Sequence, residues 1–414
     1  MDEKNYSSWR RKIILFLVSQ TISLFGSSLV QYAIMWYITL YTQSGVMMMI
    51  SIICGFLPTF FVSPLAGVWA DRFNRKRLII ISDSFIAIAT LVLAVLFLLG
   101  YDSLWLMFVV SAIRSVGTGI QTPAVGAILP QIVPEDKLTK VNATNGSIQS
   151  LVMLVSPMAS GALLTIAPIE IIFFIDVVTA AIAVLIMIFL VHIPVHEKAL
   201  HKQATSYLDD ALVGIRYIRD HKFIKSMFVF FAAFFFMAAP VAFLTPLQTT
   251  RTFGNDVWRL TAIEIVFSIG TMAGGILLAS WKGFKNKIHT MVFSSILIGL
   301  FTFALGITPI FWLYLVFMAV VGLAIPLFNT PAMVLLQEKV ENDFLGRVFG
   351  VLGMISSIMM PVGMLVFGPL ADVIEIELML IVTGIVMLLI GFALLFNRAI
   401  VAEGIPTESE TPEQ

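Results

Sequence analysis

The chain has 414 residues, of which 59% are hydrophobic and 12% are charged, and its mean hydropathy is +0.98. Soluble domains are about 45–50% apolar and about 25% charged, so this chain cannot cover its apolar surface in water. The composition therefore predicts a membrane protein whose surroundings are lipid. The formal net charge is +0, and it provides no field that would attract nucleic acid or another polyanion.

Twelve stretches are long and apolar enough to cross a bilayer as helices, which takes about 20 residues each. A β-barrel would need alternating apolar and polar residues, whereas runs such as Leu91–Leu99 and Phe228–Ala239 are apolar on every side. We therefore predict an all-α polytopic membrane protein. The predicted spans are Ile13–Thr39, Val46–Ala70, Leu78–Gly100, Leu104–Ile128, Ser147–Pro168, Ile171–Val191, Phe223–Leu247, Val257–Trp281, Ile288–Ile307, Phe311–Leu336, Val348–Leu370 and Leu378–Phe396.

The distribution of Lys and Arg predicts the orientation of these spans. Basic residues gather before the first span, in every second loop and in the central linker, and cytoplasmic loops are the ones that carry such an excess. Both termini are thus expected in the cytoplasm, in a multi-pass protein of the cell (inner) membrane. We expect six-helix halves at 1–191 and 223–397, a linker with an amphipathic helix at 192–222, and a disordered cytoplasmic tail at 398–414.

A short internal repeat supports the division into two halves. Thr122-Pro123-Ala124 near the end of the fourth span recurs as Thr330-Pro331-Ala332 near the end of the tenth. These spans hold the same place in their six-helix halves. Pseudo-symmetric halves of this kind are one repeat plan of secondary transporters, which bind substrate near the midplane between the repeats.

The loop after the second span contains the strongest motif, an ordered string of one glycine, one aspartate and several cations. Asp71 stands at a turn where its carboxylate can face a helix start, and the cations hold the turn outside the lipid. The string resembles the G-x-L-A-D-R-x-G-R-K signature of the major facilitator superfamily, with Asn74 in place of a glycine. The resemblance implies a cytoplasmic gate. The gate residues it implies are Gly67, Asp71, Arg72, Arg75 and Lys76. We expect Gly67 to allow close helix approach and Asn74 to tolerate a left-handed turn.

Two further motifs lie in the fourth and fifth spans. Arg114 precedes Gly117 within a span, where a charge must face a cavity or a partner. This pattern is similar to the family's helix 4 motif, whose arginine is implicated in proton coupling, although bonding to backbone carbonyls is an equal alternative. Ser156, Pro157 and Gly161 resemble a degenerate form of the family's antiporter motif, for which a structural kink is an equally good reading.

Other polar residues within the spans are candidates for binding protons or substrate. Asp176 and Glu264 either carry a proton or meet a cationic substrate, or else they are paired near the outer surface, for instance with Arg259. Asp83 is expected to snorkel or to pair with a cytoplasmic cation. The candidates in the first span either line a substrate cavity or join helices by hydrogen bonds. These residues are Gln20, Gln31, Tyr32 and Trp36.

Over most of the chain the fit is to the drug–proton antiporter branch of this superfamily that includes macrolide-efflux proteins. The residues that carry this resemblance include Asp71–Lys76, Arg114, Ser156-Pro157, Glu264 and Leu345–Phe349. It implies a secondary active transporter that exports amphipathic, macrolide-like drugs by proton antiport and alternating access. The alternatives are export of another small molecule such as a siderophore, facilitated nutrient transport, and a membrane sensor or scaffold that does not transport.

The sequence contains no arrangement typical of an enzyme or a cofactor site. There is no Walker A string, and the five histidines and the single cysteine, Cys54, have no metal-ligand spacing. We therefore expect no enzymatic activity, no cofactor, no metal and no nucleic acid. The expected partners are protons, a small amphipathic substrate and the lipid bilayer. The protein is expected to act as a monomer, and an ATP-binding or other partner protein remains open.

Overall fold

The computed structural model describes residues 3–191, 193 and 207–404. Regular structure in these ranges is helical, without a strand, and twelve helices are long and apolar enough to cross a membrane. The predicted fold class and the number of spans are therefore confirmed. The chain forms two compact units, one made of Met1–Tyr41 and Ile50–Tyr207 and the other of Thr42–Met49 and Leu208–Gln414.

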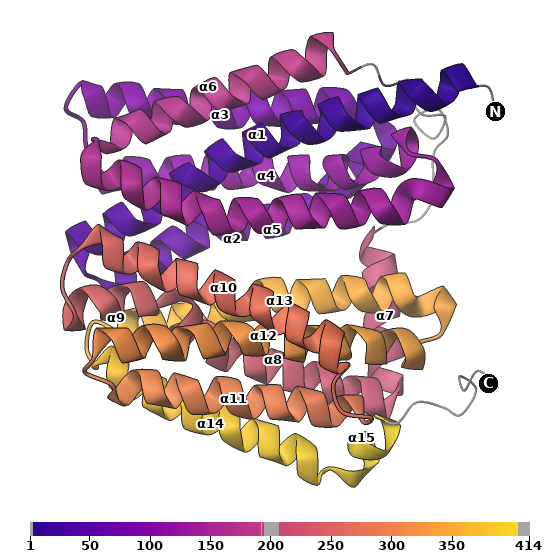
Figure 1. The fold of residues 1–414 in the computed structure, drawn as a ribbon, viewed down its shortest axis with the longest axis vertical. Helices are drawn as coiled ribbons and strands as arrows, with labels where there is room; N and C mark the ends of the chain where they lie inside the picture. The colour runs from indigo at the N-terminus through magenta and orange to yellow at the C-terminus, as the bar shows by residue number, and fades with distance from the viewer. Residues whose placement is uncertain (1–2, 192, 194–206, 405–414) are drawn as a thin grey trace. The chain divides into compact units, whose positions relative to one another are not determined.

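Six long helices supply the first unit, and helix α3 lies against both α4 and α6 (Figure 1). The first turn of α2 is grouped with the second unit and the remainder of α2 with the first. The bounds are α1 Glu3–Thr42, α2 Gly45–Arg72, α3 Arg75–Leu98, α4 Leu104–Ile132, α5 Glu135–Ile166 and α6 Ile169–Phe189.

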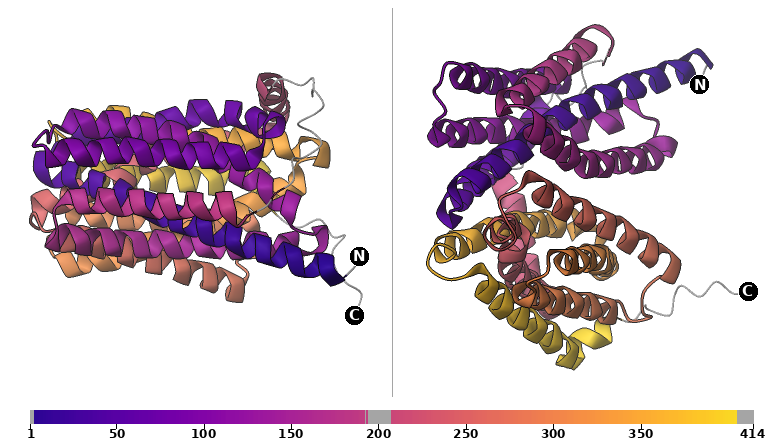
Figure 2. Two further views of the ribbon diagram at one scale, coloured as in Figure 1. Left: turned by 90° about the horizontal axis from the view of Figure 1, so that it is seen from above. Right: turned by 60° about the vertical axis from the view of Figure 1, so that its left-hand side comes forward.

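In the described part of the chain, helices α7 to α15 belong to the second unit, apart from the first residue of α7. Helix α11 packs against α12 and α14, α10 packs against α12, and α8 packs against α13 and α14 (Figure 2). The third and sixth long helices are thus paired in each unit, as α3 with α6 and α11 with α14. The bounds are α7 Tyr207–Asp220, α8 Lys222–Phe243, α9 Thr245–Thr252, α10 Val257–Trp281, α11 Lys287–Ile307, α12 Phe311–Lys339, α13 Asn342–Leu370, α14 Ile376–Phe396 and α15 Arg398–Glu403.

Three predicted boundaries differ from the structure for local reasons. The span predicted over Phe223–Leu247 consists of α8 and α9, because Pro246 starts a new helix and cannot donate a backbone hydrogen bond. Helix α5 starts at Glu135 rather than Ser147, and acidic residues in its first turn favour that start. Part of the tail predicted to be disordered forms α15, whose first turn is capped by the Asn397 side chain.

The helix in the central linker is α7, and only its second half has described side chains. Tyr217 is buried and stacks on the ring of Phe344, with centroids 4.4 Å apart. The sequence predicts an apolar stripe on this helix made of Leu208, Leu212, Ile215 and Ile218. Ile218 is buried, but Ile215 is half exposed. Leu208 and Leu212 of that stripe have side chains outside the described set.

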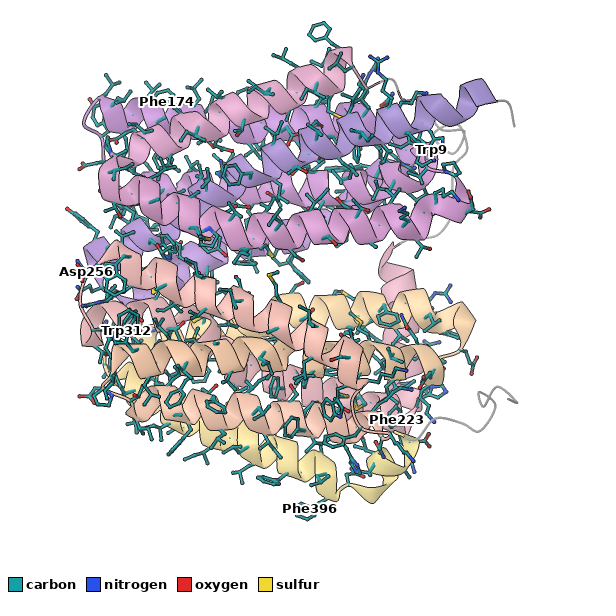
Figure 3. The ribbon with its side chains drawn as sticks, in the orientation of Figure 1. Trp9, Phe174, Phe223, Asp256, Trp312 and Phe396 are labelled. Atoms are coloured by element: carbon teal, nitrogen blue, oxygen red, sulfur yellow. The ribbon has the colours of Figure 1, made fainter. Side chains whose placement is uncertain are left out.

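The outward surfaces of both units are apolar, as lipid contact requires. Phe396 is 78% exposed and Trp312 is 69% exposed, and Figure 3 shows Phe396 pointing away from its helix bundle.

A buried apolar cluster lies inside the first unit, at the end of the unit where α2 meets α3. It consists of Ile13, Phe16, Ala70, Ile79, Ala124, Ile128, Leu129, Ile132, Val133, Met187 and Val191.

Glycines allow α10 and α12 to pack very closely. A Cβ atom added to Gly274 would lie 2.1 Å from the carbonyl oxygen of Leu323, and one added to Gly270 would lie 2.1 Å from that of Ala319. Both are backbone atoms that cannot rotate away. Gly275, the next residue, has open space at the same position among the described atoms. Small residues of this kind are what membrane helices use to approach one another.

The Gly274 and Gly275 pair gives a matched test of this packing. Alanine at either position gains about 1 kcal/mol of helix propensity. We expect Gly274→Ala to lower the melting temperature of the detergent-purified protein, since overpacking costs about 1–3 kcal/mol. Gly275→Ala, the control, should leave the melting temperature unchanged or higher. Equal melting temperatures for the two variants would contradict the close contact.

Candidate functional site

A buried ion pair joins two helices in the interior of the first unit. Arg114 on α4 is 8% exposed and Asp176 on α6 is 0% exposed. The Arg114 Nη1 atom lies 2.5 Å from Asp176 Oδ2, and Arg114 Nη2 donates to the carbonyl oxygen of Ser27 at 3.2 Å. Arg114 therefore bonds to a carboxylate and also to a backbone carbonyl, and it compensates the charge of Asp176.

Two hydroxyls complete the surroundings of Asp176. Thr90 Oγ1 donates to Asp176 Oδ2 at 3.0 Å and accepts a hydrogen bond from Arg114, while Ser27 Oγ donates to Asp176 Oδ1 at 3.3 Å. Gly26 makes room for this arrangement, because a Cβ there would lie 2.0 Å from Thr179 Oγ1 and 3.1 Å from Asp176 Oδ1. Helices α1, α3, α4 and α6 therefore all contribute to one buried charge cluster.

A second buried carboxylate, that of Asp83 on α3, has a different environment. Its exposure is 2%, so the expected snorkelling is wrong. Asp83 Oδ1 accepts hydrogen bonds from Ser23 Oγ at 2.9 Å and from Gln121 Nε2 at 2.5 Å. Asp83 Oδ2 is buried without a partner, and the ion pairs among the described residues do not include Asp83. Gln20 lies beside this group, 3.5 Å from Gln121.

The predicted gate loop uses its cations to bind helix ends. Arg75 donates to the carbonyl oxygens of Ala70 in α2 and Ala127 in α4, at 2.9 and 2.8 Å. Lys76 donates to the carbonyl oxygen of Ile188 in the last turn of α6, at 3.2 Å. Positive charge is favourable at helix C-termini, which present unpaired carbonyls and the negative end of the helix dipole. These two side chains therefore hold three helices of the first unit together.

The remaining gate residues differ from expectation or fall outside the description. Asn74 has extended geometry, with φ −64° and ψ 110°, rather than a left-handed one, and its side chain caps α3 by accepting from the Arg77 N–H. A Cβ at Gly67 would meet no described atom within 4 Å, and the close helix approach at Gly67 stays a prediction. Arg72 is exposed, and the side chain of Asp71 lies outside the described set.

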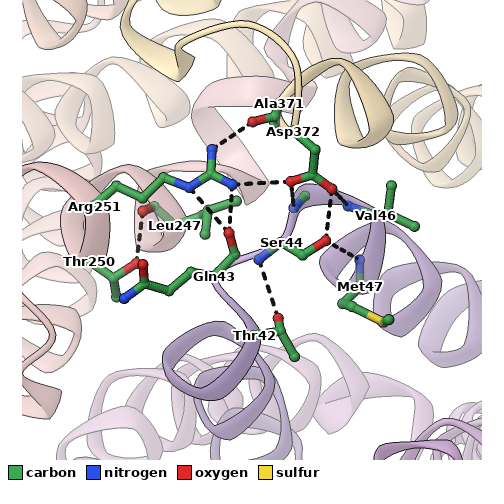
Figure 4. Close-up of polar contacts among 11 residues, drawn as sticks. Thr42, Gln43, Ser44, Val46, Met47, Leu247, Thr250, Arg251, Ala371 and Asp372 are labelled. Carbon is green, nitrogen blue, oxygen red and sulfur yellow. Dashed lines mark hydrogen bonds and ion pairs between the residues drawn. The ribbon is translucent and has the colours of Figure 1, made fainter.

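The second unit has a charged cluster of its own, at the start of α2 (Figure 4). Asp372, between α13 and α14, accepts from the backbone N–H groups of Gly45 and Val46 at 2.6 and 3.0 Å and from Ser44 Oγ at 2.7 Å. Arg251 on α9 donates to Asp372 Oδ1 at 3.0 Å and to Gln43 and Ala371 carbonyl oxygens. We call these residues the α2 clamp.

The α2 clamp satisfies the unpaired donors that any helix start presents. Burial raises the pKa of Asp372, but hydrogen bonds from Ser44, Val46, Gly45 and Arg251 outweigh burial and hold the pKa below its ordinary value. A glycine is required at position 45, because a Cβ there would lie 2.2 Å from the carbonyl oxygen of Gly368. The start of α2 is thus bound through both charge and close packing.

Glu264 on α10 is a half-buried carboxylate with no hydrogen-bond or ion-pair partner among the described residues. Arg259, the partner considered from the sequence, instead pairs with Asp256 at 3.3 Å and lies over the rings of Trp258 and Phe311. An unpaired carboxylate in an apolar helix remains available to attract a positive charge.

The candidate substrate residues of α1 lie in different surroundings. Gln31 is exposed and Tyr32 is half buried, with its ring 5.6 Å from that of Trp36. Trp36 is 0% exposed and is packed among other side chains. Gln20 is part of the group around Asp83 rather than an isolated side chain.

The motif of α5 lies against α1. Ser156, Pro157 and Gly161 are buried, and Ser160 between them donates to the carbonyl oxygen of Leu29 at 3.1 Å. An apolar groove lies elsewhere, between α8 and α14, with Lys222 and Lys225 at its rim. It includes none of the candidate substrate residues.

Comparison with known proteins agrees with this architecture. A model of the Major Facilitator Superfamily matches residues 16–364. The chain belongs to the major facilitator superfamily. Macrolide efflux protein A of Streptococcus pyogenes is 30% identical over 390 residues, which is 94% of this chain and 96% of that protein. Macrolide efflux protein A of Enterococcus faecalis is 31% identical over 312 residues, which is 75% of this chain and 96% of that protein. A solved peptide transporter in complex with alafosfalin has a TM-score of 0.71 at 14% identity, covering 95% of each chain.

Two parts of the sites in this major facilitator superfamily member differ from the sequence-based expectations. Asp83 is expected to snorkel or to pair with a cytoplasmic cation, but its partners are Ser23 and Gln121, which are far away in sequence. Asp372 is not among the expected site residues. A signal was present, since Gly368–Asp372 repeats the G-x-x-A-D pattern of Gly67–Asp71 at another helix end.

Breaking the Arg114–Asp176 pair should destabilise this superfamily member more than removing the pair entirely. Asp176→Asn or Arg114→Gln alone leaves one buried charge uncompensated, which costs about 3–5 kcal/mol. The double variant should recover much of that loss, as measured by the melting temperature of the purified protein. Additive losses in the double variant would show that the two charges do not compensate each other.

The contribution of the α2 clamp to the stability of the protein should depend on pH only under acidic conditions. Because the folded-state pKa of Asp372 is lowered, its stabilising effect is fully present above the unfolded value of about 3.9 and is lost as pH falls through the folded value. Arg251 keeps its charge throughout. The melting-temperature difference between wild type and Asp372→Asn should therefore be constant from neutral pH to about 5 and shrink below about 4. A difference that vanishes near neutral pH would contradict the arrangement.

Proposed function

We propose that this protein is a secondary active transporter that exports amphipathic, macrolide-like compounds in exchange for protons. The substrate class is carried by one observation, the similarity to macrolide efflux proteins over nearly the full length of the chain. Transport through alternating access follows from the membership of the superfamily. The proposed location is the cell membrane, with both termini in the cytoplasm, as the distribution of basic residues predicts.

Proton coupling is supported by the ionisable residues buried in the first unit. Ionisable side chains inside membrane-crossing helices are costly and mark ion pathways and proton relays. Arg114 and Asp176 form a compensated pair, and Asp83 is a second buried carboxylate in the same unit. Glu264 in the second unit is partly accessible and unpaired, which suits it to attract a cationic amphipathic substrate.

The gate proposed for the cytoplasmic side is the segment Gly67–Lys76. Arg75 and Lys76 bind carbonyl oxygens of three helices in the first unit. Any rearrangement of those helix ends has to exchange these hydrogen bonds for others. Asp71 and Arg72 would make the contacts that form and break during alternating access, as the family resemblance implies.

The proposed activity predicts a gradient-dependent efflux of macrolides. Cells that express the protein should accumulate less radiolabelled erythromycin than cells with an empty vector, and a protonophore should abolish the difference. An Arg114→Gln variant that reaches the membrane in equal amount should lose efflux, because Asp176 is left uncompensated. Susceptibility to erythromycin should rise in parallel.

Other outcomes would favour the remaining candidate functions. Efflux that survives collapse of the proton gradient would contradict proton coupling. Reduced accumulation of a siderophore but not of erythromycin would assign another exported substrate. Inward movement down a gradient would indicate facilitated uptake, and purified protein that moves none of these compounds in liposomes would favour a sensor or scaffold.

A further inference from the structure

The first unit contains two buried carboxylates, and only one of them has a compensating cation. Asp176 receives hydrogen bonds on both oxygens and an ion pair from Arg114. Among the described residues, the donors of hydrogen bonds to Asp83 are Ser23 and Gln121, both on Oδ1, and the amide of Gln20 lies beside them. In the same part of the chain, Asp83 Oδ2 is buried and has no hydrogen-bond partner. The two carboxylates therefore lie in one helix bundle but differ in their hydrogen bonds and in their counter-charges.

The charged groups of every element around Asp83 are engaged elsewhere. Helix α4 supplies Arg114, which is paired with Asp176 of α6, and α1 has no charged residue from Ile13 to its end. Glu170, also on α6, lies in its first turn. On α3 itself, Arg75 and Lys76 bind backbone carbonyls of other helices, and Arg77 is exposed.

An ionised Asp83 in this environment would leave the buried Oδ2 without a hydrogen-bond donor or a counter-charge from the described residues. Such a charge costs several kcal/mol even after relaxation, whereas an unpaired neutral hydroxyl costs about 1–3 kcal/mol. A proton on Oδ2 removes the charge and keeps both hydrogen bonds to Oδ1. The geometry of this conformation therefore suits a carboxylic acid at Asp83 and a carboxylate at Asp176.

We propose that Asp83, rather than Asp176 or Glu264, is the residue that binds and releases the transported proton. The proposal rests on the proton-coupled export described above and assigns its carrier. A proton from water binds Asp83 Oδ2 and leaves the same oxygen to water when the site opens to the other side; no other bond changes. Asp83 lies about 12 Å along α3 from the predicted cytoplasmic end, so release would be towards that side.

Asp83→Asn reproduces the shape of the protonated acid but cannot release a proton. In proteoliposomes containing the full-length protein and a pH-sensitive dye, wild type should couple erythromycin movement to a proton flux. Asp83→Asn should lose this flux and all uphill transport, while erythromycin counterflow continues at the wild-type rate. Ser23→Ala, which keeps the carboxyl group, should remain coupled but with an altered pH dependence.

A matched control variant and a spectroscopic measurement complete the test. Asp102→Asn, in an exposed loop, should keep the proton flux. Infrared difference spectra at neutral pH should show a protonated carboxyl band in wild type that is absent from Asp83→Asn. Retained proton flux in Asp83→Asn, or no change in the carboxyl band, would each overturn the assignment. Absence of proton flux in wild type would overturn the proposed function itself.

Discussion

Charged side chains within a membrane-crossing bundle must be satisfied by the protein, because lipid offers neither hydrogen bonds nor counter-charges. The first unit is arranged around this constraint. Arg114 needs Asp176, and their hydrogen-bond partners Thr90 and Ser27 come from two further helices. The same contacts that make these charges tolerable therefore fix how α1, α3, α4 and α6 pack.

Unpaired backbone groups at the helix ends must be satisfied in the same way. Cations bind the C-terminal ends and a carboxylate binds an N-terminal end, because the helix dipole has opposite signs there. Arg75 and Lys76 meet carbonyl oxygens near the C-terminal ends of helices, whereas Asp372 meets N–H groups at the start of α2. Each contact satisfies backbone groups that the helix leaves unpaired. These interactions are polar and local, and each can be exchanged for another hydrogen bond.

The two units use one packing scheme with different polar contents. The third and sixth long helices pair in both, and glycines bring α10 and α12 into contact as Gly117 and Gly119 do for α4. Among the described residues, the buried ion pair and Asp83 belong to the first unit. The interior of the second unit instead holds neutral bonds such as Tyr314 to Gln248 at 2.9 Å. Similar backbones can therefore hold buried charges in one half without the charges being repeated in the other.

The sequence alone determined that the protein is surrounded by lipid, that it is helical and that it has twelve spans, because these properties depend on local hydrophobicity and length. It also identified Arg114 and Asp176 as costly residues that need partners. Which groups became partners was decided only by tertiary structure, since Asp83 meets Ser23 and Gln121 from segments distant in the chain. Hydropathy measures the cost of burying a charged side chain, but it does not say which groups that side chain meets in the fold. Those neighbours make the carboxylate of Asp176 compensated and that of Asp83 uncompensated.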